Sequence, residues 1–221
     1  MAISLNISVA GPIANYDDLQ SEILDWMDRE GIAADAVRAP KWIQYAEAWF
    51  NRELRTPDME ATISFEIGDE DRPLPSDYLA MRSIYQETEP DKPLSGMSPD
   101  QLRQTYAGQS GIPSAYCIVA GGIRVAPVPE RDLLYTMDYF RRIDALSVVT
   151  PSNWLLETAP DLYLFAALFY GFTWSDNPVK AGMFRDLAVG LLERLKTTST
   201  ASRWGAGTRP QTVRQASRGR C

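Results

Sequence analysis

Hydrophobic residues recur at helical spacing soon after the start of the chain. Asn15 precedes them and is typical of an N-cap, because its side chain can accept a hydrogen bond from a free N–H of the first turn. We predict a first helix over residues 16–30, ended by Gly31. Its inward face is predicted to consist of Leu19, Ile23, Trp26 and Met27.

A second helix is predicted from Pro40 to just before Pro57, because the residue before a proline avoids the α region. Its wide apolar stripe consists of Trp42, Ile43, Ala46, Trp49, Phe50 and Leu54. Glu47, Arg52 and Glu53 are predicted to face outward. Two tryptophans on one helix could form a binding surface, but we assign both to the core, which is their commoner place.

The apolar period changes from helical to alternating in residues 57–150. Every second residue of residues 59–67 is apolar, which predicts a half-buried antiparallel strand. Gly121 and Gly122 lie between two apolar runs and predict a tight hairpin. Ser98 and Pro99 predict the start of a short helix. Further strands are predicted at residues 81–86, 115–120, 123–126 and 133–139, and a turn with one helical turn at 74–79.

Residues 162–174 are apolar on nearly every side of a helix and carry no charge. A helix of this kind is buried within the protein. We predict that it starts at Pro160 after a turn at residues 151–153, and that it is too short for a bilayer, which requires about 20 residues. A last helix is predicted after Pro178 and fades at residues 197–200, with an apolar face of Phe184, Leu187, Ala188, Leu191, Leu192 and Leu195.

These elements predict an α+β protein with a four-helix core, an inserted small antiparallel β region and an extended C-terminal tail. The predicted divisions are an N-terminal arm at 1–14, helical core parts at 15–56 and 151–198, the inserted β region at 57–150 and a basic tail at 199–221. The arm lacks helical spacing, so it is either a strand that pairs with another chain or a frayed end.

The charge is unevenly distributed along the chain. The net charge is −7, yet the tail has five arginines and no acid, so the preceding 198 residues carry −12. An acidic body argues against a surface that wraps DNA, because such surfaces are basic. Arg203, Trp204, Arg209 and Arg214 of the tail could contact nucleic acid through phosphate charge and base stacking, or enter an acidic groove of a protein. The remaining alternative is a disordered, solubilising tail.

The residue types needed for catalysis are scarce in this chain. It contains no histidine, which is the commonest general acid–base and metal ligand, and no phosphate-binding or nucleophile motif. The carboxylate pairs Asp17/Asp18 and Glu70/Asp71 occur where carboxylates are common for local reasons, at a helix start and in a polar loop. We therefore predict no catalytic, cofactor-binding or metal-binding residue, no cofactor and no enzyme activity.

The two cysteines fit a reducing compartment and cannot form a zinc site by themselves. Cys117 is predicted to be a small core residue, and Cys221 is either an exposed thiol or an expression remnant. The first residues lack the features of a signal peptide, and no segment is predicted to cross a membrane.

Five segments, taken in order, resemble the head–tail adaptor (connector) proteins of tailed bacteriophages, especially the short-tailed ones. They cover most of residues 15–195, and the arm before Ala14 is longer than the family pattern. The segments are NYDDLQ at 15–20 leading into Trp26, AEAWFNRELR at 46–55, LPSDYL at 74–79, GGIRVAP at 121–127 and NWLLETAPDLYL at 153–164.

The resemblance implies a structural virion protein at the head–tail junction, present in the host cytoplasm during assembly. It implies a ring of about twelve copies that docks on the portal protein, extends the DNA channel and carries tail nozzle or tail tube proteins. Double-stranded DNA would pass through the lumen without specific binding, because an acidic lining repels it. Arg203, Trp204, Arg209 and Arg214 would contact the portal. The alternative is an accessory protein that binds nucleic acid through the basic tail.

Overall fold

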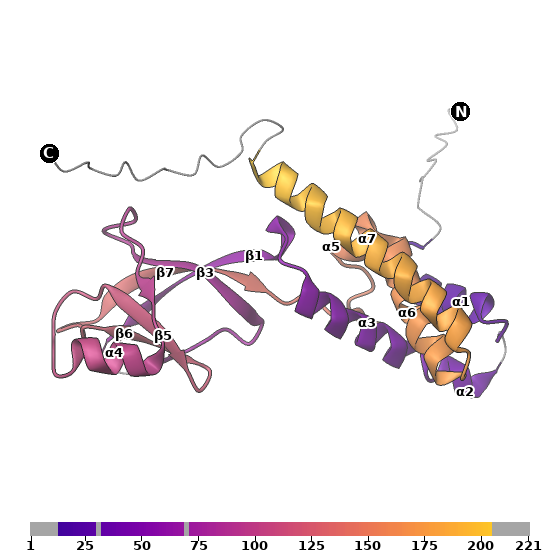
Figure 1. Cartoon of the computed structure of the whole chain (residues 1–221), viewed down its shortest axis with the longest axis horizontal. Coiled ribbons are helices and arrows are strands. Elements are labelled where there is room, and N and C mark those ends of the chain that lie inside the picture. The colour runs from indigo at the N-terminus through magenta and orange to yellow at the C-terminus, as the bar shows by residue number, and fades with distance from the viewer. Residues whose placement is uncertain (1–12, 30–31, 69–70, 205–221) are drawn as a thin grey trace, which may run out of the picture.

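The computed structural model describes residues 13–29, 32–68 and 71–204. Figure 1 shows two parts side by side in an elongated molecule. We call them the helical body, formed by residues 13–56 and 142–204, and the β region, formed by residues 57–141. The chain therefore crosses between the two parts twice, once after α3 and once after β7.

The helical body takes helices from both ends of the described chain. They are α1 (Tyr16–Trp26), α2 (Ala33–Ala36), α3 (Ala39–Glu53), α5 (Trp154–Thr158), α6 (Pro160–Trp174) and α7 (Pro178–Trp204). α6 lies at the centre and contacts α1, α3, α5 and α7. Gly171 allows α6 to lie close to Met27, the residue after α1, since a Cβ at position 171 would lie 2.6 Å from the Met27 sulfur. Burial of the α6 helix, predicted from its apolar sequence, is confirmed over most of its length.

The predicted four-helix core is wrong, because the helical body contains two further helices within the described ranges. Residues 151–153 were predicted to form a turn before one helix, but Asn153 caps α5, where its side chain accepts a 2.9 Å hydrogen bond from the Leu156 N–H. Ala159 then leaves the helical conformation, with φ of −144° and ψ of 66°, and separates α5 from α6. The other addition is α2, a single turn before α3. The overall class is α+β, as predicted.

Two predicted helix ends are also wrong. α1 ends at Trp26 rather than near residue 30, because Asp28 adopts a positive φ of 55° that a helix cannot contain. α7 continues to Trp204 instead of fading at residues 197–200. The Thr197 hydroxyl donates a 2.8 Å hydrogen bond to the Glu193 carbonyl one turn earlier, which accommodates this threonine within the helix.

The described part of the β region contains two sheets. The bounds of its elements are η1 (Pro57–Met59), β1 (Glu60–Ile67), β2 (Arg72–Pro73), β3 (Tyr78–Gln86), β4 (Ser95–Gly96), α4 (Pro99–Tyr106), β5 (Ala115–Val119), β6 (Gly122–Ala126) and β7 (Leu133–Arg141). The three-stranded sheet has the order β1-β7-β3, and the four-stranded sheet has the order β2-β6-β5-β4. All pairs are antiparallel except β4 with β5.

Several local predictions for the β region are confirmed. β1 is the predicted antiparallel strand, although Thr62, Ile63 and Ser64 are all exposed, and Gly121 connects β5 to β6 with φ of 79°. Ser98 caps α4 in a capping box with Gln101. Cys117 is buried, as predicted. The turn predicted within residues 74–79 is present, since the Tyr78 N–H donates a 3.0 Å hydrogen bond to the Pro75 carbonyl. The helical turn predicted there is wrong, because Tyr78 and Leu79 belong to β3, where Tyr78 pairs with Arg141 of β7.

Candidate partner-binding surfaces

Some aromatic side chains of α6 are only partly covered by the other described residues. Phe169 and Tyr170 are half-buried, and Trp174 is 45% exposed. α3 adds Tyr45 and Trp49, of which Tyr45 is exposed. We call these five residues the aromatic surface. The α6 residues and Trp49 were predicted to lie in the core, because an apolar pattern does not show which sides of a helix the other elements cover.

Four rings of the aromatic surface, those of Tyr45, Tyr170, Phe169 and Trp49, contact one another in a row. The centroids of Tyr45 and Tyr170 lie 5.5 Å apart, those of Trp49 and Phe169 6.1 Å, and those of Phe169 and Tyr170 4.8 Å. The Arg38 guanidinium lies 4.2 Å from the centroid of the Trp174 ring. Exposed aromatic residues with arginine are the composition of energetic centres in protein interfaces. This side of the helical body is therefore suited to binding another protein.

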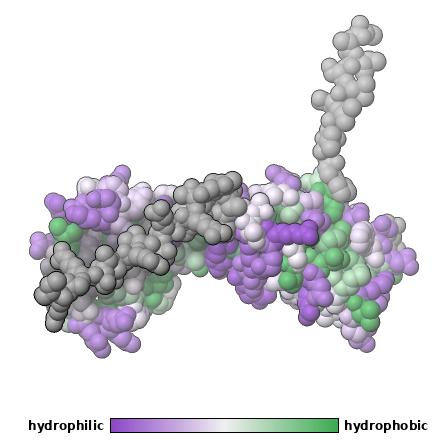
Figure 2. Space-filling model, turned by 45° about the horizontal axis from the view of Figure 1, so that its top comes forward, coloured by the Kyte–Doolittle hydropathy of each residue, from purple (hydrophilic) through white to green (hydrophobic). Residues whose placement is uncertain are grey.

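A second apolar strip follows the outer side of α7. Val179, Met183 and Leu187 are spaced four residues apart, which places them on one side of the helix. All three are exposed, Val179 to 82%. Trp26 of α1 packs beside this helix, with its ring centroid 5.9 Å from that of Phe184. Figure 2 shows hydrophobic residues among hydrophilic ones on the surface of the helical body.

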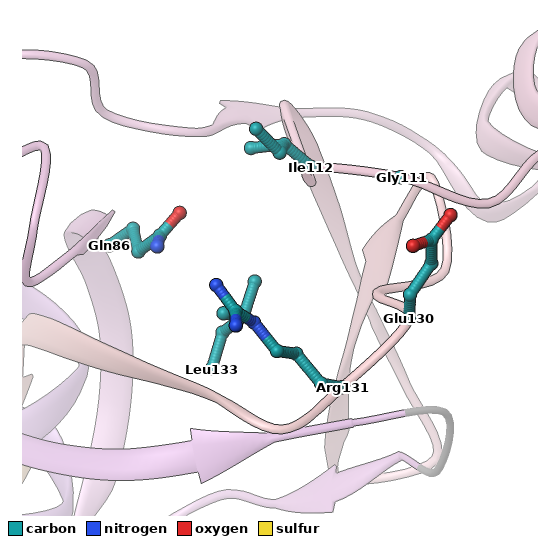
Figure 3. Close-up of a pocket in the computed structure, with 6 residues that line it drawn as sticks. All are labelled: Gln86, Gly111, Ile112, Glu130, Arg131 and Leu133. Carbon is teal, nitrogen blue, oxygen red and sulfur yellow. The ribbon is translucent and has the colours of Figure 1, made fainter.

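The β region has a hollow between loops at the ends of β3 and β7. Its volume is about 510 Å³, and its lining residues are Gln86, Gly111, Ile112, Glu130, Arg131 and Leu133. Figure 3 shows the Arg131 side chain extending into the hollow between Gln86 and Leu133. Ile112 at its edge is 70% exposed. The mixture of an apolar edge and charged side chains suits a contact with protein rather than a reaction centre.

A buried polar network joins the helical body to the segment that returns from the β region. The Glu47 carboxylate accepts a 2.7 Å hydrogen bond from the Leu146 N–H and a 3.4 Å bond from the Tyr163 hydroxyl. Asn153 donates to the same hydroxyl at 2.8 Å. Nearby, the Asn51 side chain accepts a 2.9 Å bond from the Ile143 N–H. Polar side chains of α3 thus hold the backbone of the returning segment.

The prediction that Glu47 faces outward is wrong, since the residue is only 5% exposed. Burial raises the pKa of Glu47 to about 7, and the hydrogen bonds from Leu146 and Tyr163 offset part of this effect. A signal was present in the sequence. Glu47 follows Ile43 by four residues and precedes Phe50 by three, so it shares their buried side of the helix.

The described members of the carboxylate pairs Asp17/Asp18 and Glu70/Asp71 make local contacts. The Asn15 side chain accepts hydrogen bonds from the Asp17 and Asp18 N–H groups and donates to the Asp18 carboxylate. Asp71 makes two hydrogen bonds of 2.6 Å with Arg124, and these lower the pKa of Asp71. Glu70 lies outside the described residues. Among those described, no group of three or more potential ligands is placed to hold a metal ion.

The four predicted portal-contact residues are only partly within the described chain. Arg203 and Trp204 lie in the last turn of α7, and Arg209 and Arg214 lie outside the described residues. The structure therefore does not test whether the four residues lie together. Lys196 attaches this part of α7 to α3 through a 3.0 Å ion pair with Glu53. Figure 1 shows α7 extending past α3 on the side of the β region, so Arg203 and Trp204 belong to a projecting helix end.

Comparison with known proteins gives one family match. Residues 14–214 match the family described as SU10 adaptor protein. The match includes nearly all of the helical body, the β region and all four predicted portal-contact residues, and it begins at residue 14, the last residue of the predicted N-terminal arm. No curated protein matches the chain. No described helix combines the length and apolar character that a membrane crossing requires.

Proposed function

The chain belongs to the SU10 adaptor protein family, a phage head–tail adaptor family of structural virion components, and we propose that it forms a ring-shaped adaptor between head and tail. About twelve copies would dock on the portal protein, extend the DNA channel and carry tail nozzle or tail tube proteins. The observation that carries this proposal is the family match over residues 14–214.

The helical body would form the ring. A cyclic ring needs two different surfaces on each copy, one for each neighbour. The aromatic surface of α3 and α6 and the apolar strip of α7 supply two such surfaces on different helices. Their partly exposed aromatic and aliphatic side chains would become buried between copies, which is the main favourable term in protein association.

The β region would meet the tail proteins, and its hollow with Ile112 at the edge is the contact we assign to them. The basic tail would meet the portal through Arg203, Trp204, Arg209 and Arg214, with Trp204 as the apolar anchor. The acidic balance of the first 198 residues supports a channel through which DNA passes without specific binding. Assembly would take place in the host cytoplasm.

Sedimentation of the purified protein, alone and mixed with the portal ring of the same phage, tests the proposal. We expect a complex of ring size with the portal. A chain cut after Ser199 should not join it, and a chain cut after Trp204 separates the contribution of the helix end from that of residues 205–221. If the protein ignores the portal and binds DNA in a salt-dependent manner, it is an accessory nucleic-acid-binding protein instead.

Alanine substitutions test the portal contacts separately from the fold. The variant with alanine at residues 203, 204, 209 and 214 should lose portal binding and keep its circular dichroism spectrum. Arg218→Ala combined with Arg220→Ala removes charge from the same tail and is the matched control, which should still bind. Equal binding by both variants would exclude the four residues as the portal contact.

A further inference from the structure

The N-terminal arm has a regular pattern that the family match does not include. Ile3, Leu5, Ile7 and Val9 are apolar, and the residues between them are Ser4, Asn6 and Ser8. Strict alternation over seven residues predicts a strand with one apolar and one polar face. No residue of this segment carries a charged side chain. A strand of this kind requires an edge of a sheet to pair with, because its backbone groups need hydrogen-bond partners.

The three-stranded sheet offers one long open edge. Its order places β1 at one side and β3 at the other. Residues 93 and 94 cover part of β3, where the Leu94 N–H donates a 2.8 Å hydrogen bond to the Ile84 carbonyl. β1 has eight residues and pairs only with β7 within the described ranges, so alternate backbone groups between Thr62 and Glu66 point away from the sheet. Such an edge is a template for another strand.

The side chains of β1 match the arm in pattern. Ile63 and Phe65 lie opposite Met137 and Tyr135 of β7, on the face that covers the core of the β region, yet Ile63 remains 38% exposed. An apolar side chain of an added strand would cover it. The other face of β1 is polar, with Thr62, Ser64 and Glu66, and it would lie beside the serines and asparagine of the arm. Cross-strand pairs of these kinds stabilise sheets.

The arm is tied closely to the helical body. Ile13 is buried in the core of the helical body, and the chain from Val9 to Ile13 spans at most about 14 Å when extended. β1 leaves the body for the β region, as Figure 1 shows. This short connection favours the β1 edge of a second copy over the β1 edge of the same chain.

We propose that residues 3–9 add as a strand to the free edge of β1 in a neighbouring copy of the protein. The contact would link the helical body of one copy to the β region of the next. The inference rests on the self-assembly in the proposed function, but it does not depend on the portal-contact residues. Main-chain hydrogen bonds would give the affinity, and the alternation of side chains would set which face turns inward.

Disulfide formation between two differently tagged chains tests the proposal. One chain carries Asn6→Cys at the middle of the arm, and the other carries Ser64→Cys at the middle of β1, both with Cys221→Ser. We expect a disulfide between the two chains, alone or with the portal ring. Asp91→Cys, in an exposed loop away from β1, replaces Ser64→Cys in the control and should yield about tenfold less.

Every outcome decides the proposal. A disulfide that forms only within one chain carrying both cysteines would place the arm on its own β1 and overturn it. Ring assembly without either disulfide would overturn it and leave the adaptor function intact. A disulfide between chains without portal binding would support it and reject portal docking. Absence of both disulfide and ring would reject both.

The alternation of the arm supplies a second test. Leu5→Asp with Ile7→Asp places charge on the apolar face and should reduce the disulfide between chains by about tenfold or more, because a buried unpaired charge is costly. Ser4→Asp with Ser8→Asp adds the same charge to the polar face and should change the yield by about twofold at most. Equal loss in both variants would contradict the strand pairing.

Discussion

The helical body and the β region differ in the size of the apolar cores that stabilise them. The body has one continuous core, to which helices from both ends of the described chain contribute. The β region has two smaller apolar clusters, one between the sheets and one beneath α4, and much of its surface consists of half-exposed strand residues. Burial on this scale makes the body the more stable part, since stabilisation grows with the apolar area removed from water.

The two regions also use carboxylates in opposite ways. Glu47 in the body is buried, and its pKa is raised to about 7. Asp71 in the β region is exposed enough to meet water and is paired with Arg124, and its pKa is lowered. Acid therefore favours folding at the first site and opposes it at the second. Glu47 thus holds the backbone N–H of Leu146, whereas Asp71 holds the charged side chain of Arg124.

Loss of a core ring from the helical body should have the largest effect. Phe50→Ala removes a fully buried side chain whose ring lies 5.1 Å from that of Tyr163, and it should lower the unfolding free energy by about 3–5 kcal/mol. Urea denaturation measures this. Tyr45→Ala on the same helix removes an exposed ring and should cost much less. Similar losses in both variants would refute the burial argument for the body.

The pH dependence of stability should identify Glu47. Its folded pKa is raised from the ordinary 4.5, so the folded protein keeps a proton that the unfolded chain has already released. The unfolding free energy should therefore be highest below pH 4.5 at this site and fall by about 3 kcal/mol as the pH rises to about 7 and above. Denaturation at a series of pH values would show this fall.

Glu47→Gln should remove that fall, because the amide has no proton to release in this range. Glu53→Gln, at an exposed position of the same helix, is the control and should leave the pH dependence unchanged. If the Gln variant at position 47 retains the wild-type slope, another group is responsible.

Replacement of Asn51 should destabilise the segment that connects the β region to the helical body. Asn51→Ala leaves the Ile143 N–H without its acceptor and should cost about 1–3 kcal/mol. Faster amide exchange at residues 142–147 would locate the effect in the segment between β7 and α5. Gln44→Ala on an exposed side of α3 should leave exchange unchanged. Slow exchange in both variants would mean that other contacts hold this segment.

The smallest effect is expected in the β region at Arg124. The ion pair with Asp71 is partly exposed, so Arg124→Ala should lower stability by less than about 1 kcal/mol. Because the pKa of Asp71 is lowered, this contribution is present above its ordinary value of 3.8 and is lost as the pH falls further. Thermal unfolding at pH 3 and pH 7 measures it, and a larger effect at the lower pH would contradict the assignment.

Local signals of the sequence predicted most of the individual elements. Asn15, Ser98 and Pro160 mark helix starts, and the alternation before Ile67 marks β1. These signals depend on residues close together in the sequence, so they can be recognised without knowledge of the fold. The helix start at Pro160 was predicted, but α5 was missed, because a helix of five residues is too short to show an apolar period.

The candidate surfaces were less accessible to sequence reasoning. The basic tail stood out by composition, but the aromatic surface did not, because Tyr45 and Tyr170 belong to different helices far apart in the chain. Their exposure depends on which elements cover them. An apolar pattern indicates that a side chain favours burial, but only the packed structure shows whether the same chain covers that side chain.

The sequence by itself determined the α+β class, the positions of most helices and strands, the asymmetry between an acidic body and a basic tail, and the resemblance to phage adaptors. Tertiary structure alone decided that β1 and β3 both pair with β7, that Glu47 accepts a hydrogen bond from the Leu146 N–H, and that aromatic residues remain exposed on the helical body. The physical reason is the separation along the chain over which each interaction acts. Caps and periodicity act between near neighbours, whereas burial and strand pairing depend on segments that meet only after the chain has folded.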